Sequence, residues 1–337
     1  METSRGVLTE RDMYMVLFSS VSPETLTGFG ECAPLPGLSV DNLSKLPQKL
    51  QEVCALLNSG VEVSDLDLVQ WPAIRFAVEA ARLDLERGGK RLLFDTEFTR
   101  GEQAIPINGL IVMADFDSML NQVFEKIKQG FDCIKIKVGA LDFDAECELL
   151  KEIRKRVSPA QIQLRLDANG AFGPETALDK LVRLSEFEIH SLEQPIKTGQ
   201  WETMAKICAE SPIAIALDEE LIGVHSRTKK RELLNTIKPH YIILKPTLVG
   251  GLKAAEDWIA LASQLNIDYW VTSALESNIG LNIISQWTST LPIGMHQGLG
   301  TGQLFVENFP SPLRIREGSL TYSASHTVNP LTDLKLV

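Results

Sequence analysis

The sequence lacks the cysteine spacing of a disulfide framework or of a cysteine-rich metal site. Its five cysteines are scattered over 337 residues, and no two of them form a Cys-x-x-Cys pair. The five histidines are equally dispersed and show no ligand spacing. Disulfide frameworks are typical of small secreted domains, whereas cysteines in cytosolic proteins stay reduced. We therefore expect reduced thiols and a cytoplasmic protein.

Long apolar runs and an excess of positive charge are also absent. No apolar stretch approaches the ~18 residues that suggest a membrane span. Charged residues interrupt the first 18 positions, where a signal peptide would have an apolar core. The formal charge of −11 argues against a broad surface for nucleic acid or for anionic lipid. A small anionic substrate remains compatible with this charge, because a bound cation and nearby lysines set the field inside a site.

Five charged residues recur in the middle of the chain, each at the end of a short apolar run. They are Lys137 in CIKIKVG, Asp167 in LRLDANG, Glu193 in HSLEQP, Asp218 in IAIALDEE and Lys245 in YIILKPT. Their separations of 30, 26, 25 and 27 residues correspond to one strand plus one helix. A β/α barrel keeps its chemistry at the carboxyl ends of its strands. We therefore expect all five side chains at one rim of a barrel.

The order of strand-like and helix-like segments predicts an α/β fold, a TIM-type (β/α)7β barrel with an α+β capping domain. The eight strand candidates are 105–111, 133–138, 162–167, 189–193, 213–218, 241–245, 269–273 and 293–297. The helical segments between them are 117–129, 142–156, 174–186, 200–209, 226–236, 252–265 and 278–290. Such alternation is typical of parallel strands joined by right-handed crossovers. We expect the barrel over 101–302 and the capping domain over 1–100, with 303–337 returning to it.

Three carboxylates in register favour a metal site. Asp167, Glu193 and Asp218 are expected on three consecutive strands, where uncompensated negative charges would repel one another strongly. Hard oxygen ligands without a nearby histidine or cysteine suit Mg²⁺ or Mn²⁺. A single carboxylate after a strand is more typical of a helix cap, but three in register favour a divalent cation.

Two lysines are expected to point into the barrel beside these carboxylates. Lys135 and Lys137 alternate on one predicted strand, so their side chains share a face. Buried cations are costly unless anions lie opposite, and the carboxylates provide them. Lys245 is expected across the barrel, so that bound substrate presents opposite faces to two ammonium groups. Neighbouring cations lower the pKa of a lysine and favour the neutral amine that a base requires.

This constellation suits abstraction of a proton next to a carboxylate, with the metal stabilising the enediolate that forms. It resembles the muconate-lactonizing subgroup of the enolase superfamily, in which a lysine base forms an enediolate intermediate that Mg²⁺ stabilises. Within that subgroup it most resembles the o-succinylbenzoate synthase family. The similar segments extend over nearly the whole chain: GFGECAPLPGLS, PAIRFAVEAARLD, INGLI, KIKVG, LRLDANGAF, LEQPI, ALDEEL, LKPTLVGG, TSALESNIG and GLGTG. The resemblance implies that Asp167, Glu193 and Asp218 bind Mg²⁺.

The resemblance also implies an activity, the syn dehydration of 2-succinyl-6-hydroxy-2,4-cyclohexadiene-1-carboxylate to 2-succinylbenzoate in menaquinone biosynthesis. Lys137 would remove the α-proton and then protonate the departing hydroxyl. Lys245 would hold the other face of the intermediate as a cation, and Lys135 would support Lys137 and the carboxylate. Arg165 is expected near the substrate, and Asn169 is expected to orient the metal ligands.

Substrate selection is expected to fall to the loops after the seventh and eighth strands. The candidates there are Ser273, Glu276, Ser277, Gly298 and Gly300. Barrel loops at this position commonly bind anionic groups through backbone N–H donors, so the succinyl carboxylate would be their ligand. A purely structural turn is an equally good interpretation of these loops. The GFGECAPLPG loop of the capping domain is expected to close over the site and exclude water.

Other functions remain open at this point. An N-succinylamino acid racemase would use Lys137 and Lys245 as bases on opposite faces. A dipeptide epimerase is disfavoured, because GMHQGLGT lacks the acidic pair that such enzymes carry there. A metal-dependent barrel hydrolase would need the carboxylates but not lysines on both faces. The expected partner is a small carboxylate substrate, with no nucleic acid and no membrane, and the oligomeric state stays open.

Overall fold

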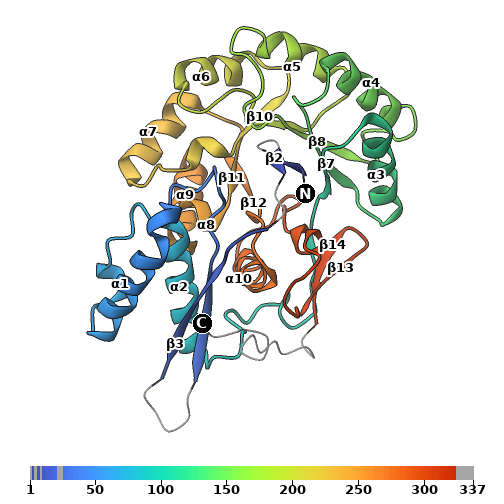
Figure 1. The fold of residues 1–337 in the computed structure, drawn as a ribbon. Coiled ribbons are helices and arrows are strands. Elements are labelled where there is room, and N and C mark those ends of the chain that lie inside the picture. Colours follow the sequence, from blue (N-terminus) through green and yellow to red (C-terminus); the bar gives the residue numbers. More distant parts are fainter. Residues whose placement is uncertain (1, 4–5, 8–9, 21–25, 324–337) are drawn as a thin grey trace.

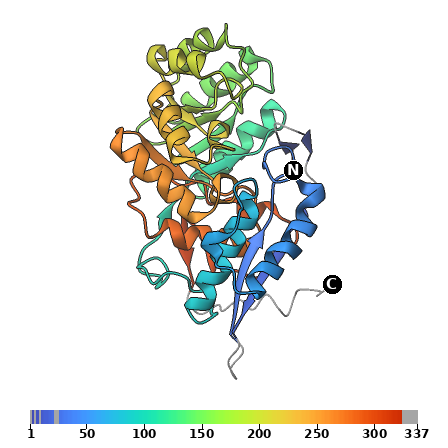
Figure 2. The ribbon, with the colours of Figure 1, turned by 90° about the vertical axis from the view of Figure 1, so that its left-hand side faces the viewer.

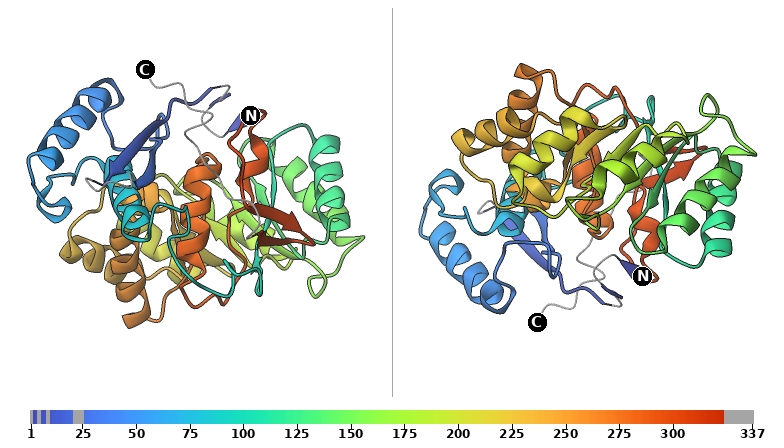
Figure 3. Two further views of the ribbon diagram at one scale, coloured as in Figure 1. Left: turned by 90° about the horizontal axis from the view of Figure 1, so that it is seen from below. Right: turned by 90° about the horizontal axis from the view of Figure 1, so that it is seen from above.

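The computed structural model describes residues 2–3, 6–7, 10–20 and 26–323 (Figure 1). Its centre is a parallel sheet of seven strands in sequence order. The strands are β6 (Gly109–Ile111), β7 (Cys133–Lys137), β8 (Gln163–Asp167), β9 (Ser191–Glu193), β10 (Ala214–Leu217), β11 (Tyr241–Leu244) and β12 (Asp268–Val271). The sheet curls around the centre of the molecule, and helices form an arc on its outer side (Figures 1 and 3).

The helices of this arc follow the strands one by one. They are α3 (Phe116–Lys128), α4 (Phe143–Arg154), α5 (Ala177–Ser185), α6 (Trp201–Glu210), α7 (Arg227–Ile237), the short α8 (Pro246–Val249), α9 (Leu252–Gln264) and α10 (Asn278–Thr288). Side-chain caps define several of the starts: Asp115 accepts a hydrogen bond from Ser118 N, and Ser226 accepts one from Lys229 N. The predicted helical segments agree with the observed ones to within three residues at each end.

The predicted eighth strand at 293–297 is not a strand in the structure. Only two isolated parallel bridges remain, from Gln297 to Ile107 and from Gly298 to Thr272. The backbone N–H of Gln297 donates to Pro106 O at 2.8 Å, and that of Gly298 donates to Val271 O at 2.8 Å. Pro292 and Gly294 precede this point, and both residue types weaken a strand. The segment nevertheless contacts both edges of the parallel sheet.

The first part of the chain forms a smaller layer against one side of the sheet (Figure 2). Its elements are the pairs β1 (Glu2–Thr3) with β2 (Gly6–Val7) and β3 (Tyr14–Ser19) with β4 (Thr27–Cys32), and the helices α1 (Leu46–Asn58) and α2 (Pro72–Glu86). Strand β4 packs directly on α2 because two glycines allow it. A Cβ at Gly30 would lie 1.8 Å from Ala77 O, and one at Gly28 would lie 2.0 Å from Ala81 O. Most buried side chains of this layer form a second cluster, but Phe76 and Ala80 of α2 belong to the main core and join the two.

The predicted C-terminal return is only partly described. Strands β13 (Leu313–Arg316) and β14 (Ser319–Tyr322) form an antiparallel sheet with β5 (Ile105–Pro106). The described part of this segment therefore pairs at the entry to the parallel sheet rather than with β3 and β4. Residues 324–337 of the predicted return lie outside the described residues. No helix in the described ranges has the length and apolar character needed to cross a bilayer.

Candidate active site

The five recurring charged residues lie together where the parallel strands end. Lys137, Asp167 and Glu193 are register partners at the last positions of β7, β8 and β9. Asp218 directly follows β10, and Lys245 directly follows β11. The prediction that strand-end side chains gather at one edge of the sheet agrees with this register.

Lys135 is the cation between the first two carboxylates. Its Nζ lies 3.0 Å from Asp167 Oδ2 and 2.6 Å from Glu193 Oε2. Burial alone would lower the pKa of Lys135, but the charges of the surrounding aspartates and Glu193 outweigh it and raise that pKa above the usual value. Lys135 is therefore held as an ammonium group that compensates buried negative charge, and its supporting role toward Lys137 and the substrate stays a prediction.

Lys137 is oriented by an asparagine on the next strand end. Its Nζ lies 3.3 Å from Asp167 Oδ2 and donates to Asn169 Oδ1 at 2.5 Å. The Asn169 amide in turn donates to Glu219 Oε1 at 3.0 Å, and its backbone N–H donates to Asp167 Oδ1 at 3.0 Å. Asn169 adopts a left-handed φ of 44°, which asparagine tolerates better than most residues. Asn169 thus contacts both Lys137 and a carboxylate, and its role in orienting the metal ligands stays a prediction.

Glu219 was missed by the sequence analysis, although it directly follows Asp218. Its contact with Asn169 joins positions 50 residues apart, so only the folded sheet reveals it. Burial and the charge of Asp218 raise the pKa of Glu219. By holding the Asn169 amide nitrogen, Glu219 leaves the amide oxygen facing Lys137.

Lys245 lies at the other end of the carboxylate row, in an ion pair with Asp218. Strands β8, β9 and β10 separate its strand from that of Lys137. Burial would lower the pKa of Lys245, but Asp218, Glu219 and Glu193 raise it and outweigh Lys135. The expectation of a lowered pKa is therefore wrong for Lys245 in this structure, because its nearest charges are carboxylates.

The three carboxylates are almost fully buried but are not gathered around one point. Their side chains are each 2% exposed. Among the residues that the structure describes, no three acidic, histidine or cysteine side chains are grouped as they would be around a bound metal ion. The Lys135 ammonium group lies between Asp167 and Glu193 instead.

The chemistry of the donors nevertheless fits a divalent cation. Within the described part of the chain, Glu193 Oε1 is buried and has no hydrogen-bond partner, which typically costs about 1–3 kcal/mol. Burial and the charge of Asp167 raise the pKa of Glu193, whereas Lys135 and Lys137 overcome the effect of burial and lower the pKa of Asp167. Carboxylate oxygens are the hard donors that Mg²⁺ prefers. Asp167, Glu193 and Asp218 would hold such an ion.

Arg165 lies one layer below the carboxylates. It is the register partner of Lys135 on β7 and of Ser191 on β9. Its guanidinium group stacks 4.1 Å from the centroid of the Trp270 ring and donates to His296 O at 2.8 Å. With 1% of its surface exposed, Arg165 is part of the sheet interior, and its contact with substrate stays a prediction.

The polar residues after β12 serve the protein's own structure. Glu276 accepts hydrogen bonds from Thr247 Oγ1 at 2.5 Å and from Ala274 N at 2.7 Å. Ser277 caps α10 and donates its backbone N–H to Glu31 Oε1 at 2.9 Å. Both side chains are at most 1% exposed. The predicted substrate contacts of Glu276 and Ser277 are therefore not supported by their geometry, because internal partners use their polar atoms.

The remaining predicted loop residues lie nearby with different partners. The hydroxyl of Ser273 pairs with that of Thr301. Gly298 bridges to Thr272 so closely that a Cβ there would lie 2.2 Å from the Thr272 hydroxyl oxygen. Gly300 starts the short 3₁₀ turn that contains Thr301. Their roles in substrate binding stay predictions.

The loop after β4 is tied to this rim by an arginine that the sequence analysis did not identify. The Arg11 guanidinium donates to Ala274 O at 2.6 Å, to Leu275 O and to Ala33 O. Ala33 belongs to the GFGECAPLPG segment, which was expected to lie over the site. Arg11 therefore connects that segment to the loop after β12.

Comparisons with known proteins agree with this geometry. Residues 118–326 match the family described as enolase C-terminal domain-like. The o-succinylbenzoate synthase of Desulfotalea psychrophila is 44% identical over 95% of this chain and 95% of that protein. The o-succinylbenzoate synthase of Vibrio cholerae is 29% identical over 90% of this chain and 86% of that protein.

Two solved structures show the same fold. The crystal structure of MenC from Desulfotalea psychrophila superposes with a TM-score of 0.81 at 39% identity, covering 93% of this chain and 99% of that one. The muconate lactonizing enzyme from Pseudomonas putida has a TM-score of 0.75 at 17% identity, covering 93% of each chain. The family match and the near full-length similarity together confirm the resemblance: this chain belongs to the enolase superfamily, in its enolase C-terminal domain-like family.

Proposed function

We propose that this protein is an o-succinylbenzoate synthase, which dehydrates 2-succinyl-6-hydroxy-2,4-cyclohexadiene-1-carboxylate to 2-succinylbenzoate with Mg²⁺ as its cofactor. The observation that carries the proposal is the buried row of three carboxylates with Lys137 at one end and Lys245 at the other. The similarity to the Desulfotalea psychrophila o-succinylbenzoate synthase over 95% of both chains supports it.

We infer that the curled sheet is a TIM-type (β/α)7β barrel over residues 101–302, capped by residues 1–100. The bridges of Gln297 and Gly298 to both edges of the parallel sheet support closure. The second apolar cluster, formed by residues of the first hundred positions, supports a distinct capping layer. The pairing of β13 and β14 with β5 suggests that part of 303–337 completes the entrance to the barrel.

The proposed reaction needs two proton transfers on one face of the substrate. Lys137, as an amine, takes the α-proton, and the electron pair of the broken C–H bond passes to the carboxylate as an enediolate. The C–O bond of the ring hydroxyl then breaks, the new double bond completes the aromatic ring, and the Lys137 ammonium group protonates the leaving oxygen to give water. Lysine therefore returns to its starting state, as a syn elimination requires.

The other residues position charge for these steps. Asp167, Glu193 and Asp218 would hold Mg²⁺, which when bound supplies positive charge beside the substrate carboxylate where negative charge develops. Asn169 orients the Lys137 ammonium group through its amide oxygen. Lys245 offers a cation on the other side of the row, and Lys135 compensates the buried carboxylates.

The direct test is turnover of the cyclohexadiene substrate by the purified protein with Mg²⁺, followed by detection of 2-succinylbenzoate by mass spectrometry. We expect stoichiometric conversion to the aromatic acid. A folded, Mg²⁺-loaded protein that forms no product would overturn the proposal.

Racemisation of N-succinylamino acids is the second candidate, because a lysine lies at each end of the carboxylate row. We expect Lys245→Arg to lower racemisation by about 10²-fold or more, since a guanidinium group has a pKa above 12 and cannot act as a base. Dehydration needs only the positive charge of Lys245 and should fall much less.

Both rates are measured on the same preparation, racemisation by incorporation of deuterium at the α-carbon in D₂O. Equal losses of the two activities would show that dehydration depends on the placement of this cation as strongly as racemisation depends on a base. A wild-type protein that exchanges no α-proton of any carboxylate substrate would instead favour a metal-dependent hydrolase.

A further inference from the structure

A cavity of about 280 Å³ opens beside Lys137. Its walls come from the loop after β6, the first turns of α3, the loop after β7 and the start of α4. The apolar part of the wall consists of Met113, Ala114, Met119, Ala140 and Leu141. A cavity of about 150 Å³ suffices for benzene, so this one has room for a six-membered ring.

The walls of the cavity are fixed by hydrogen bonds. Glu146 Oε1 accepts the backbone N–H groups of Gly139 at 2.6 Å, Ala140 at 3.1 Å and Leu141 at 3.2 Å. On the opposite wall, the Asp115 carboxylate accepts from Ser118 N and Ser118 Oγ, each at 2.9 Å. Both loops are therefore held in place before any ligand arrives, which lowers the entropic cost of binding.

The charges at the cavity restrict what it accepts. Lys137 is the one cation among the lining side chains, and its ammonium group is directed toward Asp167 and Asn169. Asp115 and Glu146 also line the cavity. A ligand group with a free carboxylate would bring a third acid against these two at short range, which is unfavourable. An uncharged, largely apolar group fits the lining.

We propose that this cavity receives the apolar group attached to the carbon that Lys137 deprotonates, and that Met113, Ala114 and Leu141 set the size limit of that group. In the dehydration substrate the deprotonated carbon is itself a ring atom, so the group is the rest of the six-membered ring, and in an N-succinylamino acid it is the side chain. The succinyl carboxylate lies elsewhere. This inference rests on the proposed function, since it assigns Lys137 to the reacting carbon.

The test fills the cavity with Ala114→Phe. We expect KM for the cyclohexadiene substrate to rise at least about tenfold with a smaller change in kcat, because the added ring occupies the volume that the substrate ring needs. N-succinylglycine has no side chain for the cavity, so its inhibition constant against dehydration should change less than twofold. The control Val182→Phe enlarges a 56% exposed side chain on α5 and should leave both constants unchanged.

A second variant changes the cavity in the opposite direction. Met113→Ala enlarges it, so N-succinyltryptophan should gain affinity as an inhibitor at least about threefold relative to N-succinylglycine. Thermal unfolding of each variant checks that the fold is retained. The cavity assignment alone is overturned if Ala114→Phe weakens the binding of the cyclohexadiene substrate and of N-succinylglycine equally. The same holds if the substitution weakens the binding of neither compound while the wild type turns over the substrate normally. A wild type that neither binds nor converts the cyclohexadiene substrate would overturn the proposed function together with the cavity assignment.

Discussion

Replacing Lys137 by alanine is expected to lower kcat for dehydration by about 10³-fold or more, while Mg²⁺ still binds. The same amine takes the α-proton and returns it to the leaving hydroxyl, and each positioned proton transfer contributes about 10²–10⁴-fold. Lys135 stays between Asp167 and Glu193 in this variant, so one ammonium group still compensates these carboxylates. Steady-state kinetics and Mg²⁺ titration calorimetry measure the two effects separately.

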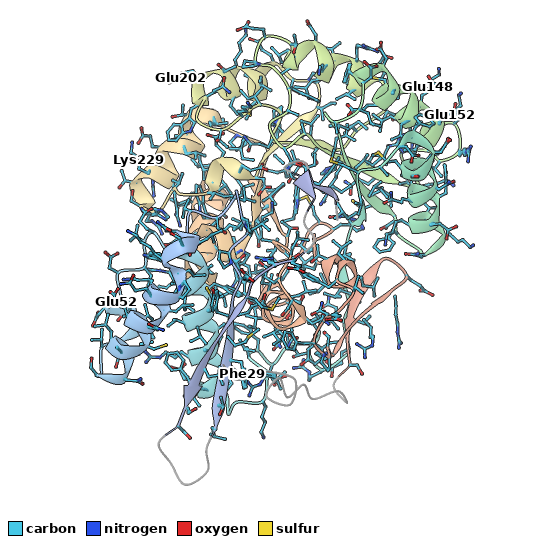
Figure 4. All side chains as sticks on the ribbon, in the orientation of Figure 1. Phe29, Glu52, Glu148, Glu152, Glu202 and Lys229 are labelled. Carbon is cyan, nitrogen blue, oxygen red and sulfur yellow. The ribbon has the colours of Figure 1, made fainter. Side chains whose placement is uncertain are left out.

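The matched control is Lys229→Ala. Lys229 projects from α7 on the outside of the molecule (Figure 4) and pairs with Glu232 on the surface. Its loss should leave kcat and Mg²⁺ affinity unchanged. A Lys137→Ala protein that keeps more than about a tenth of wild-type kcat would remove Lys137 from the chemistry.

Chelation of divalent cations is expected to reduce turnover to background, and addition of Mg²⁺ is expected to restore it. Without the cation, the negative charge on the enediolate would face three carboxylates across a short distance. Glu193→Gln should also weaken Mg²⁺ binding by more than about 10-fold. Even the replacement of a group that only supports a metal ligand typically lowers metal affinity or activity about 10–100-fold. Activity is assayed before chelation, after it, and after addition of Mg²⁺.

The control for the carboxylate variant is Glu202→Gln on α6, whose side chain projects outward (Figure 4). It removes one negative charge without touching the row. Full activity in metal-free protein would end the metal assignment. Mg²⁺ binding that is unchanged by Glu193→Gln would remove only Glu193 from the ligand set.

Local sequence patterns predicted the helices and the positions of the charged side chains well. Most barrel helices bury one face, so their apolar spacing is visible in a short window. The strand-end charges were predicted for a similar reason, because each follows an apolar run directly. The register of Lys137 with Asp167 and of Asp167 with Glu193 then follows from pairing consecutive parallel strands.

Features that depend on distant partners were not predicted. Segment 293–297 has a strand-like composition but forms a single bridge, at Gln297, with a second one at Gly298, since its extent depends on both edges of the sheet. The hydrogen bonds of Glu276 with Thr247 and of Ser277 with Glu31 join residues far apart in the sequence, so they could not be predicted from the loop after the seventh strand. Arg11 acts across 263 residues of sequence, and no short window contains such a contact.

Helix starts in the barrel depend on residues from the first hundred positions. Glu79 on α2 accepts the backbone N–H of Leu252 at 2.9 Å, at the start of α9. Glu31 on β4 accepts the N–H groups of Ser277 and Gly280 at 2.9 and 2.8 Å, at the start of α10. Helix starts leave backbone donors unpaired unless another group accepts from them. A barrel fragment excised from residue 101 onward would therefore leave the backbone N–H groups of Leu252, Ser277 and Gly280 without these acceptors, and the two layers should unfold in a single transition rather than one after the other.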